Sequence, residues 1–224
     1  MFSRKSRMAV YSKPDHWSLK AQKEGYPARS VYKLKEMDEK FGLIKSGRPD
    51  NRVLDLGAAP GSWSLYLLRK FLAGGAPSGS RQFSLVSVDL SPLSRQHDEG
   101  LFDRDGFTFI MGDFLLPETR EAILSRGPYN LLVSDAAPAT SGNRSLDTLR
   151  SLDLAENALY YAETALAKGG NFVVKVFQGG DTGALLKKIR ELFESGKSFK
   201  PQACRAESFE TYYIGMGKKS TNSE

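Results

Sequence analysis

Residues 52–63 read Arg-Val-Leu-Asp-Leu-Gly-Ala-Ala-Pro-Gly-Ser-Trp, a short apolar strand followed by a turn of small residues and the first residues of a helix. Strand-like and helix-like segments alternate along the rest of the chain. The predicted strands cover residues 52–56, 83–89, 107–111, 129–134 and 171–177, and the predicted helices cover residues 62–71, 118–125, 152–167 and 183–193. This alternation is typical of an α/β protein with a doubly wound, Rossmann-like sheet of mostly parallel strands.

The flanking segments complete the predicted domain. Residues 29–41 form an amphipathic helix pattern. Its apolar stripe consists of Val31, Leu34, Met37 and Phe41. Two more strand-like segments, residues 201–206 and 210–215, have no helix between them, which predicts a C-terminal antiparallel hairpin and a seven-stranded sheet. We therefore expect a basic N-terminal arm over residues 1–28, a single domain over residues 29–217 and a flexible tail over residues 218–224.

The composition argues against several classes of protein. The chain of 224 residues has one cysteine, Cys204, and two histidines. A disulfide within the chain is therefore impossible, and a zinc site is not expected. No apolar run approaches the roughly 20 residues that a membrane-spanning helix needs. We expect a monomeric, cytoplasmic protein with no metal and no membrane contact.

Positive charge is concentrated near the N-terminus. The net charge is +6, and residues 1–48 hold 12 Lys and Arg against 5 Asp and Glu, a net of +7 that leaves −1 for the rest. The aromatic residues in the same region are Tyr11, Trp17, Tyr26 and Tyr32. Cationic and aromatic side chains together suit an RNA partner, whose phosphates and bases they bind. A solvated basic tail explains the charge equally well.

The residues after each predicted strand are candidates for ligand binding, because ligands of doubly wound sheets bind beyond the carboxyl ends of the strands. Gly57, Ala58 and Gly61 allow a backbone turn to approach a ligand closely. Their spacing does not match the dinucleotide pattern Gly-x-Gly-x-x-Gly, and Pro60 has no N–H to offer a pyrophosphate. A ligand without phosphates is therefore favoured.

Two further strand ends point to a nucleoside. Asp89 follows the second strand, where a carboxylate can accept hydrogen bonds from both ribose hydroxyls. The alternative role for Asp89 is that of an N-cap for a following helix. Asp113 and Phe114 follow the third strand and are placed to hold the amino group and face of an adenine. Among common cofactors, S-adenosylmethionine fits such a pocket.

Lys175 lies in the otherwise apolar segment 171–178, where a charged group is expensive unless it is paired or used. Asp135 follows the fourth predicted strand. Neighbouring strands lie about 4.8 Å apart, so the two side chains can interact if their strands are adjacent. A structural ion pair and a catalytic pair both remain open at this point.

Four motifs resemble the FtsJ/RrmJ family of ribose 2′-O-methyltransferases. They are Asp-Leu-Gly-Ala-Ala-Pro-Gly at 55–61 with Trp63, Ser-Asp-Ala-Ala-Pro at 134–138, Phe-Val-Val-Lys-Val-Phe-Gln-Gly at 172–179, and Arg-Ser-Val-Tyr-Lys-Leu at 29–34. The resemblance extends from about Lys20 to Gly217. It implies a class I S-adenosylmethionine-dependent methyltransferase fold.

The resemblance also implies roles for particular residues. The catalytic tetrad of the family falls on Lys33, Asp135, Lys175 and Glu210. The expected cofactor contacts are Gly57, Ala58, Pro60, Gly61, Trp63, Asp89, Asp113, Phe114 and Asp135. In the resulting hypothesis, Lys175 takes the proton of the ribose hydroxyl or polarises its oxygen, while Lys33 and Glu210 orient the ribose. The implied substrate is a uridine of large-subunit ribosomal RNA in the assembled particle.

Some features depart from the family pattern or leave alternatives. Ser62 and Ala139 stand where glycine and asparagine are usual, which makes the RNA position less secure than the type of reaction. Residues 136–138, Ala-Ala-Pro, lack the motif for methylation of a base amine. Cys204 is expected to be a buried filler away from the strand ends, which argues against pyrimidine C5 methylation. Methylation of tRNA or another RNA, and a non-catalytic RNA-binding assembly factor, remain as alternatives.

Overall fold

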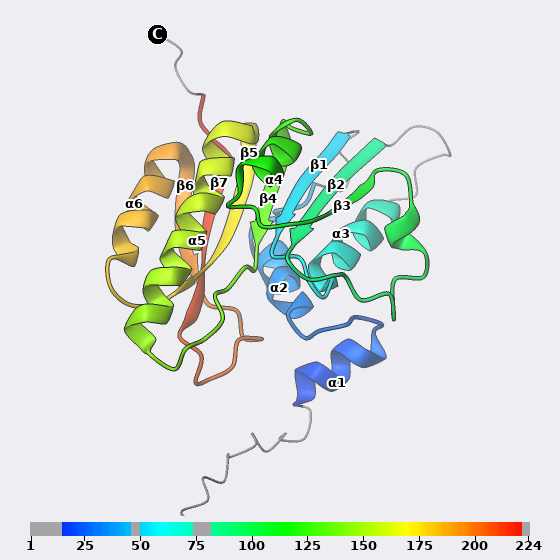
Figure 1. Cartoon of the computed structure of the whole chain (residues 1–224), viewed down its shortest axis with the longest axis horizontal. Helices are drawn as coiled ribbons and strands as arrows, with labels where there is room; N and C mark the ends of the chain where they lie inside the picture. The colour runs from blue at the N-terminus through cyan, green and yellow to red at the C-terminus, as the bar shows by residue number, and fades with distance from the viewer. Residues whose placement is uncertain (1–14, 46–49, 74–81, 221–224) are drawn as a thin grey trace, which may run out of the picture.

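The sheet of the protein has seven strands in the order β3-β2-β1-β4-β5-β7-β6 (Figure 1). The structure, a computed structural model, describes residues 15–45, 50–73 and 82–220. The strands are β1 (Asp50–Leu56), β2 (Gln82–Asp89), β3 (Phe107–Met111), β4 (Tyr129–Ser134), β5 (Leu166–Phe177), β6 (Phe193–Phe199) and β7 (Glu210–Lys218). Strands β3, β2, β1, β4 and β5 pair in parallel, whereas β7 runs antiparallel to both of its neighbours. The predicted fold class and C-terminal hairpin are confirmed.

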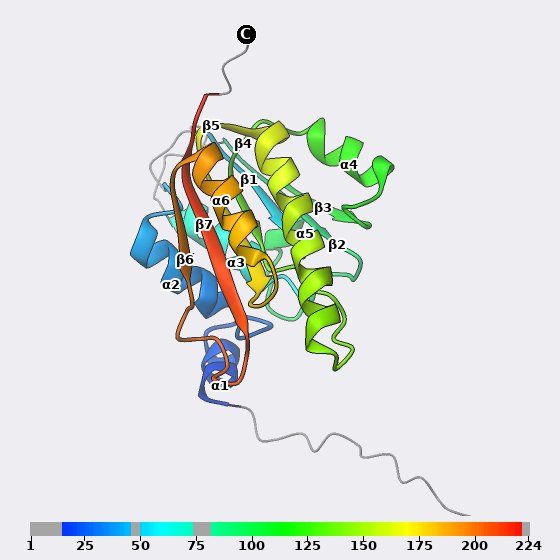
Figure 2. The same ribbon diagram turned by 90° about the vertical axis from the view of Figure 1, so that its left-hand side faces the viewer.

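Helices cover both faces of the sheet (Figure 2). They are α1 (His16–Lys23), α2 (Val31–Phe41), α3 (Ser62–Ala73), α4 (Pro117–Leu124), α5 (Arg144–Ala165) and α6 (Thr182–Leu192), with a short 3₁₀ helix at Leu101–Asp103. Buried side chains of α2 and α3 form one hydrophobic core with one sheet face, and those of α4, α5 and α6 form a second core on the other face. Central strands are therefore apolar on both sides; in β1, for example, Val53 enters the first core while Leu54 and Leu56 enter the second.

Residues 15–28 are part of the folded domain and not a separate arm. Helix α1 is capped by the Asp15 carboxylate, which accepts a hydrogen bond from the Ser18 N–H at 2.9 Å. Ala21 and Tyr26 are buried in the first core. The predicted boundary at residue 28 is therefore wrong. Residues 1–14 of the predicted arm lie outside the described residues, and contact between this region and RNA stays a prediction.

The partner strand of the C-terminal hairpin differs from the sequence-based expectation. The strand was expected at residues 201–206, but β6 begins at Phe193 directly after α6. Residues 201–206 instead form a turn, in which the Cys204 N–H donates to the Pro201 carbonyl at 3.1 Å. Strand β6 has the sequence Phe-Glu-Ser-Gly-Lys-Ser-Phe and lies at the sheet edge, where polar residues face solvent and hide the apolar strand pattern.

The end of the chain is more ordered than the predicted tail at residues 218–224. Lys218 belongs to β7 and is 7% exposed. Its ammonium donates hydrogen bonds to the carbonyls of Glu163, at 2.6 Å, and Leu166, at 2.8 Å, at the C-terminus of α5. A cation at this position satisfies free carbonyls and complements the negative end of the helix dipole. Residues 221–224 lie outside the described residues. Within the described part of the chain, no helix is long and apolar enough to cross a bilayer.

Candidate active site

A cavity of about 530 Å³ lies beyond the carboxyl ends of β1, β2, β3 and β4. Its lining comes from the turn after β1, the ends of the other three strands, the loop after β4 and the N-terminal half of α5. The lining residues are Gly57, Ala59, Asp89, Leu90, Gly112–Leu115, Asp135–Ala139, Arg150, Asp153 and Leu154. The volume falls within the usual range for small-molecule sites of roughly 300–1,000 Å³.

The Asp89 carboxylate is fixed in the cavity wall by two backbone groups. Its Oδ2 accepts a hydrogen bond from the Ala59 N–H at 2.9 Å, and its Oδ1 accepts one from the Ser91 N–H at 2.8 Å. Because a carboxylate oxygen can accept two hydrogen bonds, each oxygen keeps one free position for a hydroxyl group. The alternative N-cap role is excluded, since residues 90–100 contain no helix.

The end of β3 contributes a second carboxylate and an aromatic ring. Asp113 accepts a hydrogen bond from the Leu115 N–H at 2.9 Å. Phe114 is 7% exposed and its carbonyl accepts a hydrogen bond from Tyr161, so only a small part of the ring faces the cavity. Both residues line the same cavity as Asp89.

Gly57 brings the turn after β1 close to the loop after β4. Its φ is +74°, and a Cβ atom added there would lie 2.5 Å from the Ala136 Cα. Only glycine fits both the left-handed conformation and the contact. This close approach places the turn after β1 and the loop after β4 side by side in the wall of the cavity.

Four expected cofactor contacts lie outside the cavity lining. They are Ala58, Pro60, Gly61 and Trp63. Trp63 is 2% exposed because α3 turns it into the first core, and its indole N–H donates to the Ser30 carbonyl at 2.8 Å. In the structure Trp63 fixes the start of α2, and with it the position of Lys33.

The four residues of the expected tetrad converge at the edge of this cavity. The Lys175 ammonium lies 2.9 Å from Asp135 Oδ1 and also donates to the Asp135 carbonyl. The Lys33 ammonium lies 2.9 Å from the Glu210 carboxylate. Strands β4 and β5 are adjacent, which is the condition that the Asp135–Lys175 pair required. The Lys33–Glu210 pair joins residues 177 positions apart in sequence and the Asp135–Lys175 pair residues 40 apart, and the fold brings the two ion pairs side by side.

Comparison with known proteins identifies the family. Residues 26–218 match the FtsJ-like methyltransferases. The chain belongs to this family. It is similar to the ribosomal RNA large subunit methyltransferase E of Treponema denticola, with 48% identity over 93% of this chain and 97% of that protein. The corresponding protein of Borrelia garinii subsp. bavariensis is 42% identical over 92% of this chain and 97% of its own length.

Solved structures support the fold of this FtsJ-like methyltransferase. A crystal structure of a ribosomal RNA methyltransferase, putative, from Plasmodium falciparum superposes with a TM-score of 0.67 and 23% identity, covering 86% of this chain and 98% of the other. Human methyltransferase-like protein 13 in complex with SAH superposes with a TM-score of 0.57 and 12% identity, covering 86% and 84%. At these identities the likeness concerns the fold alone.

The cavity of this FtsJ-like methyltransferase fits S-adenosylmethionine, the cofactor of the family. Asp89 has two free acceptor positions that could take ribose hydroxyls, and Asp113 and Phe114 line the same cavity. Asp135 lines the same cavity and brings negative charge to the side on which the cationic sulfonium would lie.

Tyr212 connects the two ion pairs, and sequence reasoning did not assign it a role. It is fully buried, and its hydroxyl donates to Asp135 Oδ1 at 2.6 Å. The Lys33 ammonium lies 5.8 Å from the centre of its ring. Burial, followed by the negative charges of Asp135 and Glu210, raises the pKa of Tyr212 well above its ordinary value, so the phenol stays a donor. The available signal was its position two residues after Glu210, on the same face of a strand.

Charge is balanced within this group. Burial by itself lowers the pKa of Lys33, but the carboxylates of Asp135 and Glu210 outweigh burial and raise it above the ordinary value. Burial raises the pKa of Asp135, but Lys175, Lys33 and the hydrogen bond from Tyr212 outweigh it and lower the pKa. Lys33 and Asp135 are therefore both charged near neutral pH.

A second cavity, of about 370 Å³, lies on the Lys33–Glu210 side of the tetrad. Its lining comes from the segment before α2, from α2 itself and from the loop between β6 and β7. The lining residues are Ala28, Arg29, Ser30, Lys33, Ala203, Arg205, Glu207, Ser208 and Glu210. Asp135 thus faces one cavity and the Lys33–Glu210 pair faces the other. This arrangement suits a group transfer between two molecules that enter from different sides.

The expected position of Cys204, away from the strand ends, is wrong. The loop between β6 and β7 brings the thiol close to Glu210, the first residue of β7, and to Lys33, and the charges of both act on it. Burial, with the charge of Glu210, raises the pKa of Cys204 to about 12. A protonated thiol is a poor nucleophile, so covalent chemistry at Cys204 is not supported.

Proposed function

We propose that this protein transfers a methyl group from S-adenosylmethionine to the 2′-oxygen of a ribose in RNA, and that the substrate is a uridine of large-subunit ribosomal RNA within the ribosomal particle. The observation that carries this proposal is the pair of ion pairs between the two cavities, with Asp135 on one side and Lys33 and Glu210 on the other. The names of the relatives support ribosomal RNA as the substrate class.

The two cavities divide the work of the reaction. The bound cofactor supplies a methyl group already activated on a sulfonium. Asp89 and Asp113 fix the nucleoside end of the cofactor cavity, and Asp135 fixes its other end beside Lys175. Holding the two reactants in line lowers the activation barrier of such a transfer by a large share.

The side chains around the second cavity position the ribose. Lys33 and Glu210 provide a donor and acceptors for its hydroxyl groups at a site where both side chains are nearly buried, with exposed fractions of 11% and 12%. Lys175 contacts the 2′-oxygen and holds it at hydrogen-bonding distance. Asp135, which contacts both Lys175 and Tyr212, fixes the position of the Lys175 side chain. Preorganised groups of this kind need no rearrangement as charge develops on the reacting oxygen.

Replacing Lys175 tests its role. A Lys175→Met variant is expected to methylate RNA roughly 10²–10⁴-fold more slowly, the usual loss for a group that handles a proton. Its affinity for cofactor, measured by calorimetry, should stay close to that of the parent protein. Lys187→Met, which removes a lysine with 80% exposure on α6, is the control and should change neither quantity. Near-normal methylation by Lys175→Met would contradict the mechanism.

A Lys175→Arg variant separates two versions of the mechanism. A guanidinium can donate a hydrogen bond to the oxygen but cannot accept the proton, because arginine stays protonated in proteins. Substantial methylation by this variant would show that Lys175 polarises the oxygen. Inactivity with normal cofactor affinity would support the other version, in which Lys175 reacts as the neutral amine and accepts the proton that the 2′-hydroxyl loses.

The substrate is tested with labelled cofactor and separate pools of large ribosomal subunits, naked ribosomal RNA and tRNA. We expect label in the large subunits and one 2′-O-methylated uridine on mapping. Preferential labelling of tRNA would replace the substrate but keep the reaction, and failure to bind the cofactor would favour a non-catalytic assembly factor. Both cavities are built within one chain, so we further propose that the protein acts as a monomer, in the cytoplasm.

A further inference from the structure

Two arginines line the second cavity together with Lys33 and Glu210, and the mechanism above does not use them. Arg29 precedes α2 and its side chain is only 15% exposed. An ion pair with Asp15 and a hydrogen bond to the Ala203 carbonyl at 2.5 Å hold its guanidinium in place. Because a guanidinium has five N–H donors, Arg29 keeps donors for a ligand.

Arg205 reaches the same cavity from the loop between β6 and β7. It is exposed, and it forms no ion pair with any residue that the structure describes. Both arginines line one cavity, so their like charges repel each other across it. In line with this, burial and then the charge of Arg205 lower the pKa of Arg29. An anion between them would remove this repulsion.

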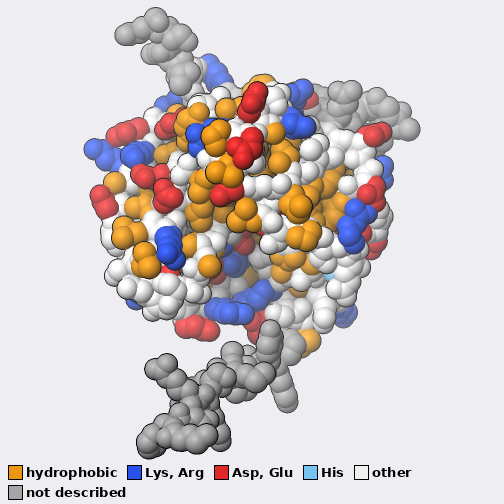
Figure 3. Space-filling view, in the orientation of Figure 1, with side chains coloured by type: hydrophobic (Ala, Val, Ile, Leu, Met, Phe, Trp, Pro, Cys, Tyr) orange, Lys and Arg blue, Asp and Glu red, His pale blue; other side chains and the backbone are white. Residues whose placement is uncertain are grey.

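Two of the cationic side chains of the lining already have carboxylate partners: Lys33 is paired with Glu210, and Arg29 with Asp15. Glu207 also lines the cavity, and its charge raises the pKa of Arg29, which offsets part of the repulsion. Figure 3 shows Lys and Arg side chains gathered at the lower edge of this face, and Figure 1 places the ends of the sheet and α1 near the same edge. Arg205 is thus the lining cation without an ion pair among the described residues, and a ligand with one negative charge would complement it.

RNA carries such a charge beside the reacting atom. The 2′-oxygen and the 3′-oxygen lie on neighbouring ribose carbons, and the 3′-oxygen is esterified to phosphate. A ribose placed between Lys33, Glu210 and Lys175 therefore brings one phosphodiester into the same cavity. Arginine binds phosphate through parallel N–H donors, which gives orientation as well as affinity.

We propose that Arg29 and Arg205 form a clamp for the phosphodiester on the 3′ side of the methylated nucleotide, with Arg29 as its fixed half and Arg205 as its exposed half. The clamp rests on the proposed function. It would orient the ribose from outside the tetrad, so that the 2′-oxygen and not another hydroxyl meets the methyl group.

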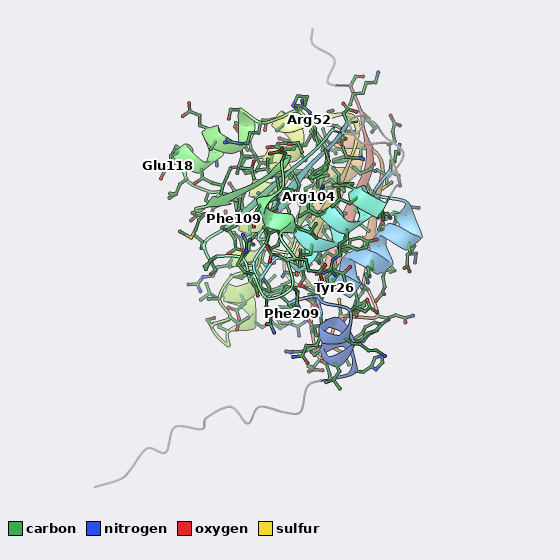
Figure 4. All side chains as sticks on the ribbon, turned by 90° about the vertical axis from the view of Figure 1, so that its right-hand side faces the viewer. Tyr26, Arg52, Arg104, Phe109, Glu118 and Phe209 are labelled. Carbon is green, nitrogen blue, oxygen red and sulfur yellow. The ribbon has the colours of Figure 1, made fainter. Side chains whose placement is uncertain are left out.

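The test uses an RNA oligonucleotide that spans the nucleotide mapped as methylated. One version has ordinary linkages, and the other has a single uncharged methylphosphonate on the 3′ side of that nucleotide. Binding is measured by fluorescence anisotropy at several salt concentrations, for the parent protein and for Arg205→Gln and Arg29→Gln. Arg52→Gln removes the same charge at the opposite end of the sheet from Phe209, which marks the β6–β7 loop (Figure 4), and serves as the matched control.

The expected results concern both charge and position. The methylphosphonate should weaken binding to the parent protein roughly tenfold, the usual scale for a hydrogen-bonded charge contact. It should cause little further loss in Arg205→Gln, because the two changes remove the same interaction. The slope of log affinity against log salt concentration should be shallower by about 0.7 for Arg205→Gln than for the parent protein. This is the change expected for the loss of one phosphate contact to single-stranded RNA. Arg52→Gln should respond to the methylphosphonate like the parent protein.

Two results would overturn the clamp. One is equal loss on methylphosphonate substitution in the parent protein and in both arginine variants; the other is an unchanged affinity of the parent protein for the uncharged linkage. Arg205 is exposed, so its variant keeps the test valid if Arg29→Gln folds poorly. Failure of the parent protein to methylate any RNA pool would refute the proposed function, whereas normal methylation with arginine variants that match Arg52→Gln would refute the clamp alone.

Discussion

The protonation of Asp55 gives a quantitative test of the packing beneath the cofactor cavity. Asp55 lies in β1 and is fully buried; its Oδ2 accepts a hydrogen bond from Ser64 at 2.8 Å, and its Oδ1 has no hydrogen-bond partner. Burial raises the pKa of Asp55 to about 7 against the hydrogen bond from Ser64, with smaller contributions from the charges of Asp135 and Asp89. The folded protein therefore holds a proton that the unfolded chain loses at much lower pH.

The sign of the effect follows from this difference. Between the ordinary pKa of 3.8 and the raised pKa of about 7, the folded state binds more protons than the unfolded state, so stability falls as pH rises through this window. At about 1.4 kcal/mol per pKa unit, the total loss is at most roughly 4 kcal/mol. From about pH 5 to about pH 8, the loss is roughly 2–3 kcal/mol.

An Asp55→Asn variant isolates this contribution, because an amide does not titrate and its oxygen can keep the bond from Ser64. Urea denaturation of the cofactor-free protein at both pH values should show the variant gaining roughly 2–3 kcal/mol relative to the parent protein as pH rises. Asp105→Asn, at an exposed position, is the control and should show no such gain. A constant difference between Asp55→Asn and the parent protein at both pH values would refute the reasoning.

Two further predictions concern Tyr212 and Lys218. Tyr212→Phe removes the hydrogen bond to Asp135 and should lower kcat, measured at saturating RNA, roughly tenfold. The affinity for cofactor should not change. An unchanged kcat would show that the hydroxyl does not position the tetrad. Lys218→Met leaves two carbonyls at the end of α5 without this donor and should lower the free energy of unfolding, measured in urea, by about 1–3 kcal/mol. The control Lys187→Met should not lower it. Equal stability of the two variants would argue against a capping role for Lys218.

Some features could be predicted from the sequence because they depend on local patterns or strand order. Asp89, Asp113, Asp135 and Lys175 follow or occupy apolar strands, and parallel strands bring their carboxyl ends together. Helix α1 was missed because its apolar residues are few, and it is held by contacts such as that of the Trp17 and Tyr32 rings at 5.0 Å.

Other features depend on tertiary contacts that no local pattern reports. Trp63 stands in a motif whose neighbours face the cavity, yet the direction of α3 turns its ring into the core. Cys204 reaches Glu210 only because a loop folds back between two antiparallel strands. Arg29 and Arg205 lie far apart in sequence, and the cavity that they share is formed by α2 and the β6–β7 loop together.

The position of β7 has a consequence for synthesis of the protein. This strand follows all the other strands in the chain, yet it lies between β5 and β6 and carries Glu210, the partner of Lys33. A nascent chain that ends before residue 210 contains the strands that border the first cavity but not Glu210, which lines the second. Until residue 210 has been added, Lys33 therefore lacks the carboxylate with which it pairs in the folded protein.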